Sequence, residues 1–253
     1  MNSLETASII FICTFGAGLV GMMLHIKLPD HHLDADSKDV VKLIMGLIAT
    51  IAALVLSLLI ASGSSTYQAQ ENDMRSLSAN IILLDRAMSL YGPDAKEARN
   101  LLHQAVADMH RRIWMGQGPG TAGFDPQATQ RMADAFVTSF QMLSPKTDSQ
   151  RMLKTQAMQI VQTLGQTRLL MFEQSASSIS WPFLTVLVFW ICMLFVGFGL
   201  LARINATITV AVFVGAISVA GAVVLILELN EPYEGFLRIS DAPLRAALAQ
   251  IDR

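Results

Sequence analysis

The stretch LIMGLIATIAALVLSLLIASGSSTYQAQ, residues 43–70, contains no Asp, Glu, Lys or Arg. Three further stretches share this property: residues 6–26, 174–202 and 204–227. A helix of about 20 predominantly apolar residues can cross a hydrocarbon layer of roughly 30 Å. The sequence therefore predicts an all-α membrane protein with four transmembrane helices, whose first partner is the lipid bilayer.

The composition agrees with this prediction. Hydrophobic residues make up 53% of the chain and charged residues only 15%, whereas a soluble domain is about 25% charged. A net charge of −2 lacks the basic excess that nucleic-acid binding requires, so no nucleic-acid partner is expected. Cys13 and Cys192 both lie inside apolar stretches, where they are expected to be small packing residues. Glu5 stands where a signal peptide would be positive, so the first helix is expected to be retained.

The charge distribution divides the chain into four parts. Residues 1–63 hold transmembrane helices at about 7–27 and 40–62. Residues 64–176 hold most of the charges and are expected to form a soluble segment of amphipathic helices. Residues 177–229 hold the third and fourth transmembrane helices, and residues 230–253 form a tail with a short amphipathic helix.

Apolar residues in the soluble segment repeat at steps of three and four, which is the spacing of a one-faced helical stripe. The first stripe consists of Met74, Leu77, Ile81, Leu84, Met88 and Tyr91. It ends at Gly92-Pro93, and further helices are predicted over 94–115, 126–143 and 148–178. The helix over 94–115 is expected to bury Ala98, Leu102, Ala105, Met109 and Ile113.

Four crossings place both termini and residues 64–176 on one side of the membrane. The basic residues near the two sides balance, so the positive-inside rule does not decide the orientation. Translocation of a helical segment of this length is the less common arrangement. The termini and residues 64–176 are therefore expected in the cytoplasm, with the protein in the cell membrane.

Small residues line one drifting face of the second transmembrane helix. They are Gly46, Thr50, Ala53, Ser57 and Ala61. Such a face allows helix backbones to approach closely, so one interpretation is packing inside the four-helix unit. The other is that the face lines a pore, where the Thr50 and Ser57 hydroxyls replace part of an ion's hydration shell. The sequence leaves both open.

The scarcity of ionisable groups in the spans limits the transport mechanisms. Proton-coupled transporters usually keep carboxylates or histidines within their spans. Here His25, near an interface, is the one such residue besides the cysteines. This favours either a passive pore or a scaffold that transports nothing.

No enzyme, cofactor or metal site is predicted. The densest group of ligand-type residues contains His31, His32, Asp34 and Asp36, but no His-x-x-x-His spacing fixes two of them on a helix face. They are therefore only weak metal-ligand candidates. His103 and His110 lack an acidic ligand pattern and are expected on a solvated face. No nucleophile elbow, phosphate loop, paired Cys-x-x-Cys or zinc-protease motif occurs.

Several motifs resemble those of the bestrophin-like membrane proteins. They are Ser37-Lys38-Asp39-Val40-Val41-Lys42-Leu43, Ile82-Leu83-Leu84-Asp85-Arg86 with Tyr91-Gly92-Pro93, and Pro232-Tyr233-Glu234-Gly235-Phe236 with Ala242-Pro243-Leu244-Arg245. The resemblance covers nearly the whole chain, in a family usually labelled as a domain of unknown function.

A looser resemblance connects the chain with bestrophins proper, which are pentameric anion channels gated by calcium. In them the second helix lines the pore, and an Asn-Pro-Phe turn followed by an acidic run binds calcium. Asn230-Glu231-Pro232-Tyr233-Glu234 stands in the equivalent place here, but the acidic run is missing. The resemblance therefore implies a passive homo-oligomeric channel, a pentamer by analogy, for a small anion. The alternative is a non-transporting membrane scaffold or sensor whose cytoplasmic helices bind a partner.

Overall fold

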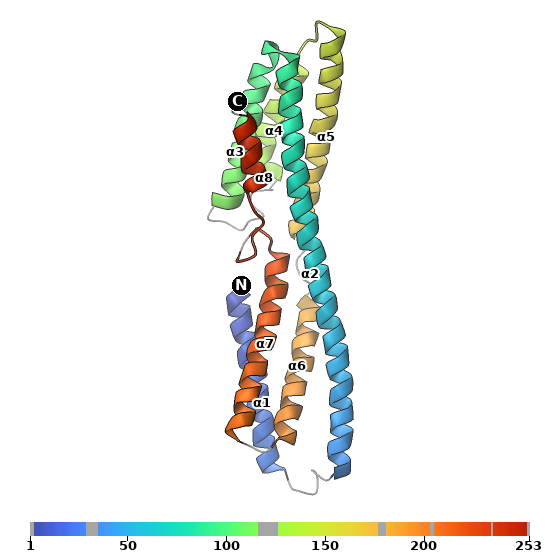
Figure 1. Cartoon of the computed structure of the whole chain (residues 1–253), viewed down its shortest axis with the longest axis vertical. Coiled ribbons are helices and arrows are strands. Elements are labelled where there is room, and N and C mark those ends of the chain that lie inside the picture. The colour runs from blue at the N-terminus through green and yellow to red at the C-terminus, as the bar shows by residue number, and fades with distance from the viewer. Residues whose placement is uncertain are drawn as a thin grey trace. The chain divides into compact units, whose positions relative to one another are not determined.

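The computed structural model describes residues 3–28, 35–115, 126–176, 181–202, 205–233 and 235–251. Every regular element in these ranges is helical (Figure 1). The main helices are α1 (Ser3–Lys27), α2 (Ala35–Tyr91), α3 (Lys96–His110), α4 (Pro126–Gln141), α5 (Asp148–Ala176), α6 (Trp181–Leu201), α7 (Ala206–Asn230) and α8 (Ala242–Ile251). A short 3-10 turn, Pro93–Ala95, precedes α3, and a π-helical turn, Arg111–Met115, follows it.

The helices form two compact units. Unit 1 comprises residues 1–65 and 179–230, and unit 2 comprises residues 66–178 and 231–253. In the described part of the chain, α1, α2, α6 and α7 are long and apolar enough to cross a membrane. The predicted all-helical fold with four such helices is therefore confirmed.

The second helix is longer than the sequence suggested. It was predicted to end near residue 62, but α2 is one helix that continues to Tyr91. The stretch Ser62-Gly63-Ser64-Ser65 has low helix propensity, yet a single Gly costs only about 1 kcal/mol. Without a proline, nothing removes a hydrogen bond or blocks the preceding turn. The helix therefore propagates through this stretch.

In unit 1, α1 packs against both α6 and α7. The contact between α1 and α6 depends on glycines. A Cβ added at Gly21 would overlap the carbonyl of Val196, and one added at Gly199 would overlap the carbonyl of Gly18. Small residues permit this approach because lipid supplies no hydrophobic force between helices and close packing must hold them together.

Two further features connect the helices of unit 1. The rings of Phe11 and Phe15 on α1 each meet Phe213 of α7 edge-on, with centroids 5.5 Å and 5.6 Å away. At the far end of α1, the Nδ1 of His25 lies 2.8 Å from the carbonyl oxygen of Leu200 on α6. The histidine in the span is therefore engaged in a contact between helices.

The core of unit 2 contains the whole first stripe predicted from the sequence. Met74, Leu77, Ile81, Leu84, Met88 and Tyr91 are all buried. The stripe on α3 differs at one position, because Val106 is buried while Ala105 is half-buried. From the tail helix α8, Leu244 and Ala247 are fully buried in this core.

The turn between α2 and α3 explains one of the motifs. Gly92 has a φ of 110°, a conformation that a residue with a Cβ adopts only under strain. Beyond the turn, Arg99 of α3 binds Asp85 of α2 with two hydrogen bonds, from Nε to Oδ1 at 2.7 Å and from Nη2 to Oδ2 at 3.0 Å. Asp85 and Gly92 thus set the geometry of the α2–α3 pair.

Candidate functional site

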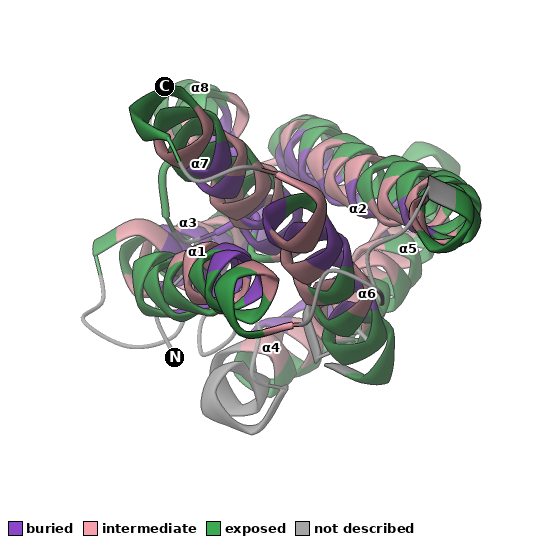
Figure 2. Cartoon of the chain, turned by 90° about the horizontal axis from the view of Figure 1, so that it is seen from below, coloured by how far each residue is buried: buried purple, intermediate pink, exposed green. Residues whose placement is uncertain are grey.

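The small-residue face of α2 is exposed. Gly46, Thr50, Ala53, Ser57 and Ala61 all have exposed positions in unit 1. In the most apolar 18-residue stretch of α2, only 11% of the residues are buried, whereas 39% are buried in the corresponding stretch of α6. Figure 2 shows exposed residues along much of α2. The structure therefore brings the five candidates together on one exposed face of α2.

A different side of α2 packs against its own bundle. Met45, Ala52 and Gly63 are buried there, and a Cβ added at Gly63 would lie 3.3 Å from the Cβ of Leu229 on α7. A third side is bulky, apolar and exposed. It carries Leu47, Ile51, Leu54 and Leu58. The helix thus has one packed side and two exposed sides of different size and polarity.

Glycines on the two kinds of surface differ in what surrounds them. A Cβ at Gly46 meets no atom within 4 Å, whereas one at Gly197 of α6 would overlap the side chain of Met45. Small residues on α1 and α6 therefore serve packing within the chain. Among the described residues of unit 1, by contrast, the small face of α2 is exposed.

The hydroxyl of Thr50 is already engaged. Its Oγ1 donates a hydrogen bond to the carbonyl of Gly46 at 2.9 Å, the usual back-bond of a threonine within a helix. The donated proton is no longer available to an anion, and the hydroxyl oxygen retains its acceptor capacity. Thr50 therefore offers this face a hydroxyl acceptor but no available donor.

The weak metal candidates are not brought into a site that can be described. His31, His32 and Asp34 lie outside the described residues, and Asp36 is exposed in the first turn of α2. Within the described ranges, no group of three or more His, Cys, Asp or Glu side chains is placed to hold a metal ion.

The turn after α7 binds its own backbone. The N–H of Ile239 donates to the carbonyl of Pro232 at 2.7 Å, and Arg238 Nε donates to the carbonyl of Tyr233 at 3.1 Å. Carbonyl oxygens are calcium ligands, and each of these two accepts one hydrogen bond and keeps a second lone pair. Glu234 lies outside the described residues.

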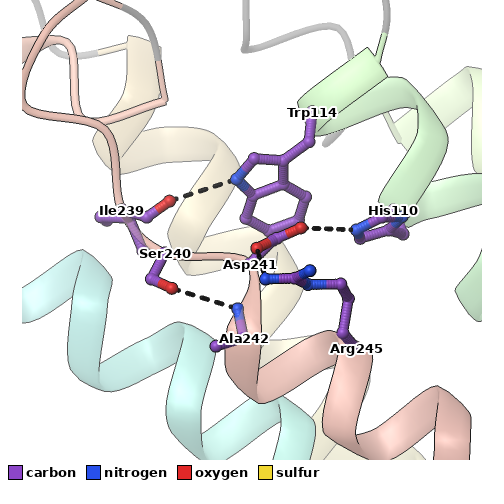
Figure 3. Close-up of polar contacts among 7 residues, drawn as sticks. All are labelled: His110, Trp114, Ile239, Ser240, Asp241, Ala242 and Arg245. Carbon is purple, nitrogen blue, oxygen red and sulfur yellow. Dashed lines mark hydrogen bonds and ion pairs between the residues drawn. The ribbon is translucent and has the colours of Figure 1, made fainter.

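The tail is anchored to the end of α3 (Figure 3). The indole Nε1 of Trp114 donates to the carbonyl of Ile239 at 3.1 Å, and Nε2 of His110 lies 3.1 Å from Oδ2 of Asp241. Arg245, one turn into α8, pairs with the other carboxylate oxygen at 2.9 Å. Burial raises the pKa of Asp241, but the His110 hydrogen bond and the Arg245 charge lower it more, so the net pKa is below the usual value.

The prediction of a solvated face was wrong for His110. This side chain is buried beside Trp114, with ring centroids 5.4 Å apart. Periodicity did contain a signal, because His110 directly follows the buried Met109 and precedes Ile113 by three residues. Its acceptor, Asp241, lies far along the chain, and no local pattern reveals that pairing.

Comparisons with known proteins agree on one fold. The family model of the Bestrophin-like domain matches residues 12–244. A crystal structure of a bacterial bestrophin homologue from Klebsiella pneumoniae, carrying one substitution, superposes with a TM-score of 0.72 at 10% sequence identity, covering 97% of each chain. A search of curated proteins gave no match. At this identity the structural likeness describes the fold alone.

Proposed function

Because the chain belongs to the bestrophin-like family, we propose that it is one subunit of a passive, homo-oligomeric channel for small anions. The observation that carries this proposal is the exposure of Gly46, Thr50, Ala53, Ser57 and Ala61 on one side of α2. In this proposal the small face of each copy points toward a common axis and the bulky face toward lipid. Five copies are expected by analogy with bestrophins.

The chemistry of the face suits a gate that acts by dewetting. Between Gly46 and Ala61 the α2 helix has no charged residue, and the Thr50 hydroxyl donates its proton within the helix. A narrow apolar constriction excludes water and thereby blocks ions until it widens. Selection among anions then depends on how readily each loses its hydration shell.

The expected topology follows from the same proposal. Four spans place both termini and unit 2 on one side, which we assign to the cytoplasm of the cell. The lipid bilayer and further copies of the chain are the partners.

Reconstitution of the purified protein into liposomes tests the function. Ion flux and subunit number are measured on the same preparation. We expect an oligomer that conducts anions without a proton gradient. A strict monomer without flux would instead favour the alternative, a non-transporting scaffold or sensor that binds a partner.

A matched pair of variants tests the pore wall. Ala53 on α2 and Ala211 on α7 are both exposed alanines in apolar spans. Ala53→Asn is expected to change conductance or selectivity with the oligomer intact, whereas Ala211→Asn leaves both unchanged. Unchanged flux in a correctly assembled Ala53→Asn oligomer would exclude this face as the wall. Loss of the oligomer in Ala53→Asn alone would identify the face as a packing surface between copies.

A further inference from the structure

The turn after α7 presents two adjacent apolar side chains at the surface of unit 2. Phe236 is 79% exposed and Leu237 is 38% exposed. On either side of them, Tyr233 and Ile239 are buried in the core of unit 2. We call residues 232–239 the tail loop and Phe236-Leu237 its tip. The chain thus enters the core, leaves it for the tip and returns to it.

The tail loop is closed and fixed at its base. The N–H of Ile239 donates to the carbonyl of Pro232 at 2.7 Å, which joins the two ends of the loop. The indole of Trp114 donates to the carbonyl of Ile239 at 3.1 Å and so attaches the base to the end of α3 (Figure 3). Gly235 has a φ of 72°, a left-handed conformation that glycine adopts without strain. The exposure of the tip is therefore a consequence of an ordered turn.

The length of α7 indicates what surrounds this loop. The helix has 25 residues, which corresponds to about 37 Å. This length exceeds a hydrocarbon core of about 30 Å but not a bilayer of about 40–45 Å with its headgroups, so a crossing helix of this length ends among the headgroups. Pro232 follows Asn230, the last residue of α7, by two residues, or about 7 Å of extended chain. The base of the tail loop is therefore expected at the bilayer surface.

The charges of the loop favour an apolar attachment over an ionic one. Residues 231–240 include two acidic residues, Glu231 and Glu234, and one basic residue, Arg238. Anionic headgroups attract segments with a basic excess, and this segment has none. Phenylalanine and leucine side chains, in contrast, partition into the boundary between headgroups and acyl chains.

We propose that the tip of the tail loop inserts between the lipid headgroups, so that Phe236 and Leu237 contact the acyl chains. The area of the tip favours lipid over a second copy of the chain. A stable protein interface covers about 800 Å² on each partner, and two side chains at a loop tip offer only a fraction of that area. Through Ile239 and Trp114, the inserted loop holds the end of α3 at the bilayer surface.

This proposal is independent of conduction. It needs the four crossings but neither a pore nor an oligomer, and a failure of the channel proposal leaves it unaffected.

The test places a nitroxide spin label at the tip in the full chain, reconstituted into phosphatidylcholine nanodiscs. Cys13→Ala and Cys192→Ala provide a background without other thiols, and Phe236→Cys and Leu237→Cys are labelled one at a time. Both positions are exposed, so either variant is expected to fold. Power-saturation measurements compare collisions of the label with oxygen, which concentrates in the hydrocarbon, and with a water-soluble nickel chelate.

Leu90→Cys is the matched control. Leu90 is a leucine of unit 2 that is 65% exposed. It lies 20 residues along α2 beyond Gln70, where the charge-free stretch ends, which is about 30 Å of helix. The same label at Leu90 is therefore expected to meet the nickel chelate freely.

We expect the ratio of oxygen to nickel collisions to be several times higher at Phe236 and Leu237 than at Leu90. Equal ratios at the three positions would overturn the proposal. Shielding of the tip from both reagents would also overturn it, because a second copy of the chain would then cover the loop. Addition of phosphatidylglycerol to the nanodiscs is expected to leave the ratio at the tip unchanged. A high ratio that requires this anionic lipid would replace apolar insertion with attraction to headgroups.

Discussion

Arg99 and Asp85 form a bidentate ion pair between α3 and α2, with Nε 2.7 Å from Oδ1 and Nη2 3.0 Å from Oδ2. The Asp85 side chain is 10% exposed and that of Arg99 is 28% exposed. The pair is therefore largely withdrawn from water, and each charge depends on the other for compensation.

The first prediction concerns this pair. Arg99→Met leaves the Asp85 carboxylate buried without its partner, and we expect a loss of about 2 kcal/mol in unfolding free energy. Thermal unfolding of the solubilised protein measures the effect as a lower midpoint. Combining Arg99→Met with Asp85→Leu should restore part of the loss. A double variant no more stable than the single one would contradict this account.

The second prediction concerns the turn after α2. At Gly92 the φ of 110° makes any side chain strained, so Gly92→Ala is expected to cost about 1 to 2 kcal/mol. The same substitution at Gly165, inside α5, is expected to stabilise by up to about 1 kcal/mol. Opposite shifts of the unfolding midpoint are the expected result, and shifts of the same sign would show that backbone conformation does not dominate at these sites.

The third prediction separates two uses of small residues. Gly21→Ala forces a Cβ into the carbonyl of Val196, while Gly46→Ala places one in open space within unit 1. We expect the Gly21 variant to be lost or polydisperse in size-exclusion chromatography, because α1 and α6 can no longer approach. The Gly46 variant should yield normal amounts of folded subunit. Equal yields from the two variants would argue against the close α1–α6 contact.

The fourth prediction concerns the tail anchor and pH. The net pKa of Asp241 is below its usual value: burial raises it, but the His110 hydrogen bond and the Arg245 charge outweigh that effect. A carboxyl with a lowered pKa stabilises the fold above its unfolded pKa of about 3.9, and this contribution is lost as the pH falls through the folded pKa. Asp241→Asn should therefore lower the unfolding midpoint at pH 7, with a difference that shrinks below about pH 4.

A matched control for the tail anchor is Asp148→Asn. Asp148 also pairs with an arginine, but its side chain is 94% exposed, and exposed pairs contribute little. We expect no measurable pH-dependent difference for this variant. If the unfolding midpoints of the Asp148 and Asp241 variants changed identically with pH, the change would come from the lost negative charge and not from the tail anchor.

The fifth prediction concerns selectivity. The proposed pore wall offers no charged side chain between Gly46 and Ala61, and Thr50 donates its proton to Gly46. Passage is then limited by dehydration, so thiocyanate and iodide should cross liposome membranes faster than chloride. Anion-replacement flux assays measure the order. Faster passage of chloride, or of cations, would contradict an apolar wall.

Much of the fold could be predicted from the sequence. Long charge-free stretches predict helices that cross a membrane, because the bilayer permits only backbone that is hydrogen-bonded within itself. The stripe from Met74 to Tyr91 predicted a buried helix face, and each of its members is buried. Both signals are local, since length and periodicity are properties of one segment.

The candidate site could be predicted only as a set of positions. Small residues give the same sequence signal at two very different positions. A Cβ added at Gly21 would overlap the backbone of α6, whereas a Cβ added at Gly46 would meet no atom within 4 Å. Whether a small residue is packed or open depends on where the neighbouring helix lies. The sequence alone therefore left the small face of α2 with two interpretations.

By itself, the sequence determined the number of helices that are long and apolar enough to cross a membrane, the buried stripe from Met74 to Tyr91 and the break at Gly92-Pro93. Only the tertiary structure decided that α2 is continuous to Tyr91, that His110 meets Asp241 across 131 positions, and that four helices line an apolar groove. The physical reason is the distance along the chain over which each kind of signal acts. Propensity and periodicity act within a few turns, whereas pairings and cavities arise from side chains of distant segments that meet only after the helices pack.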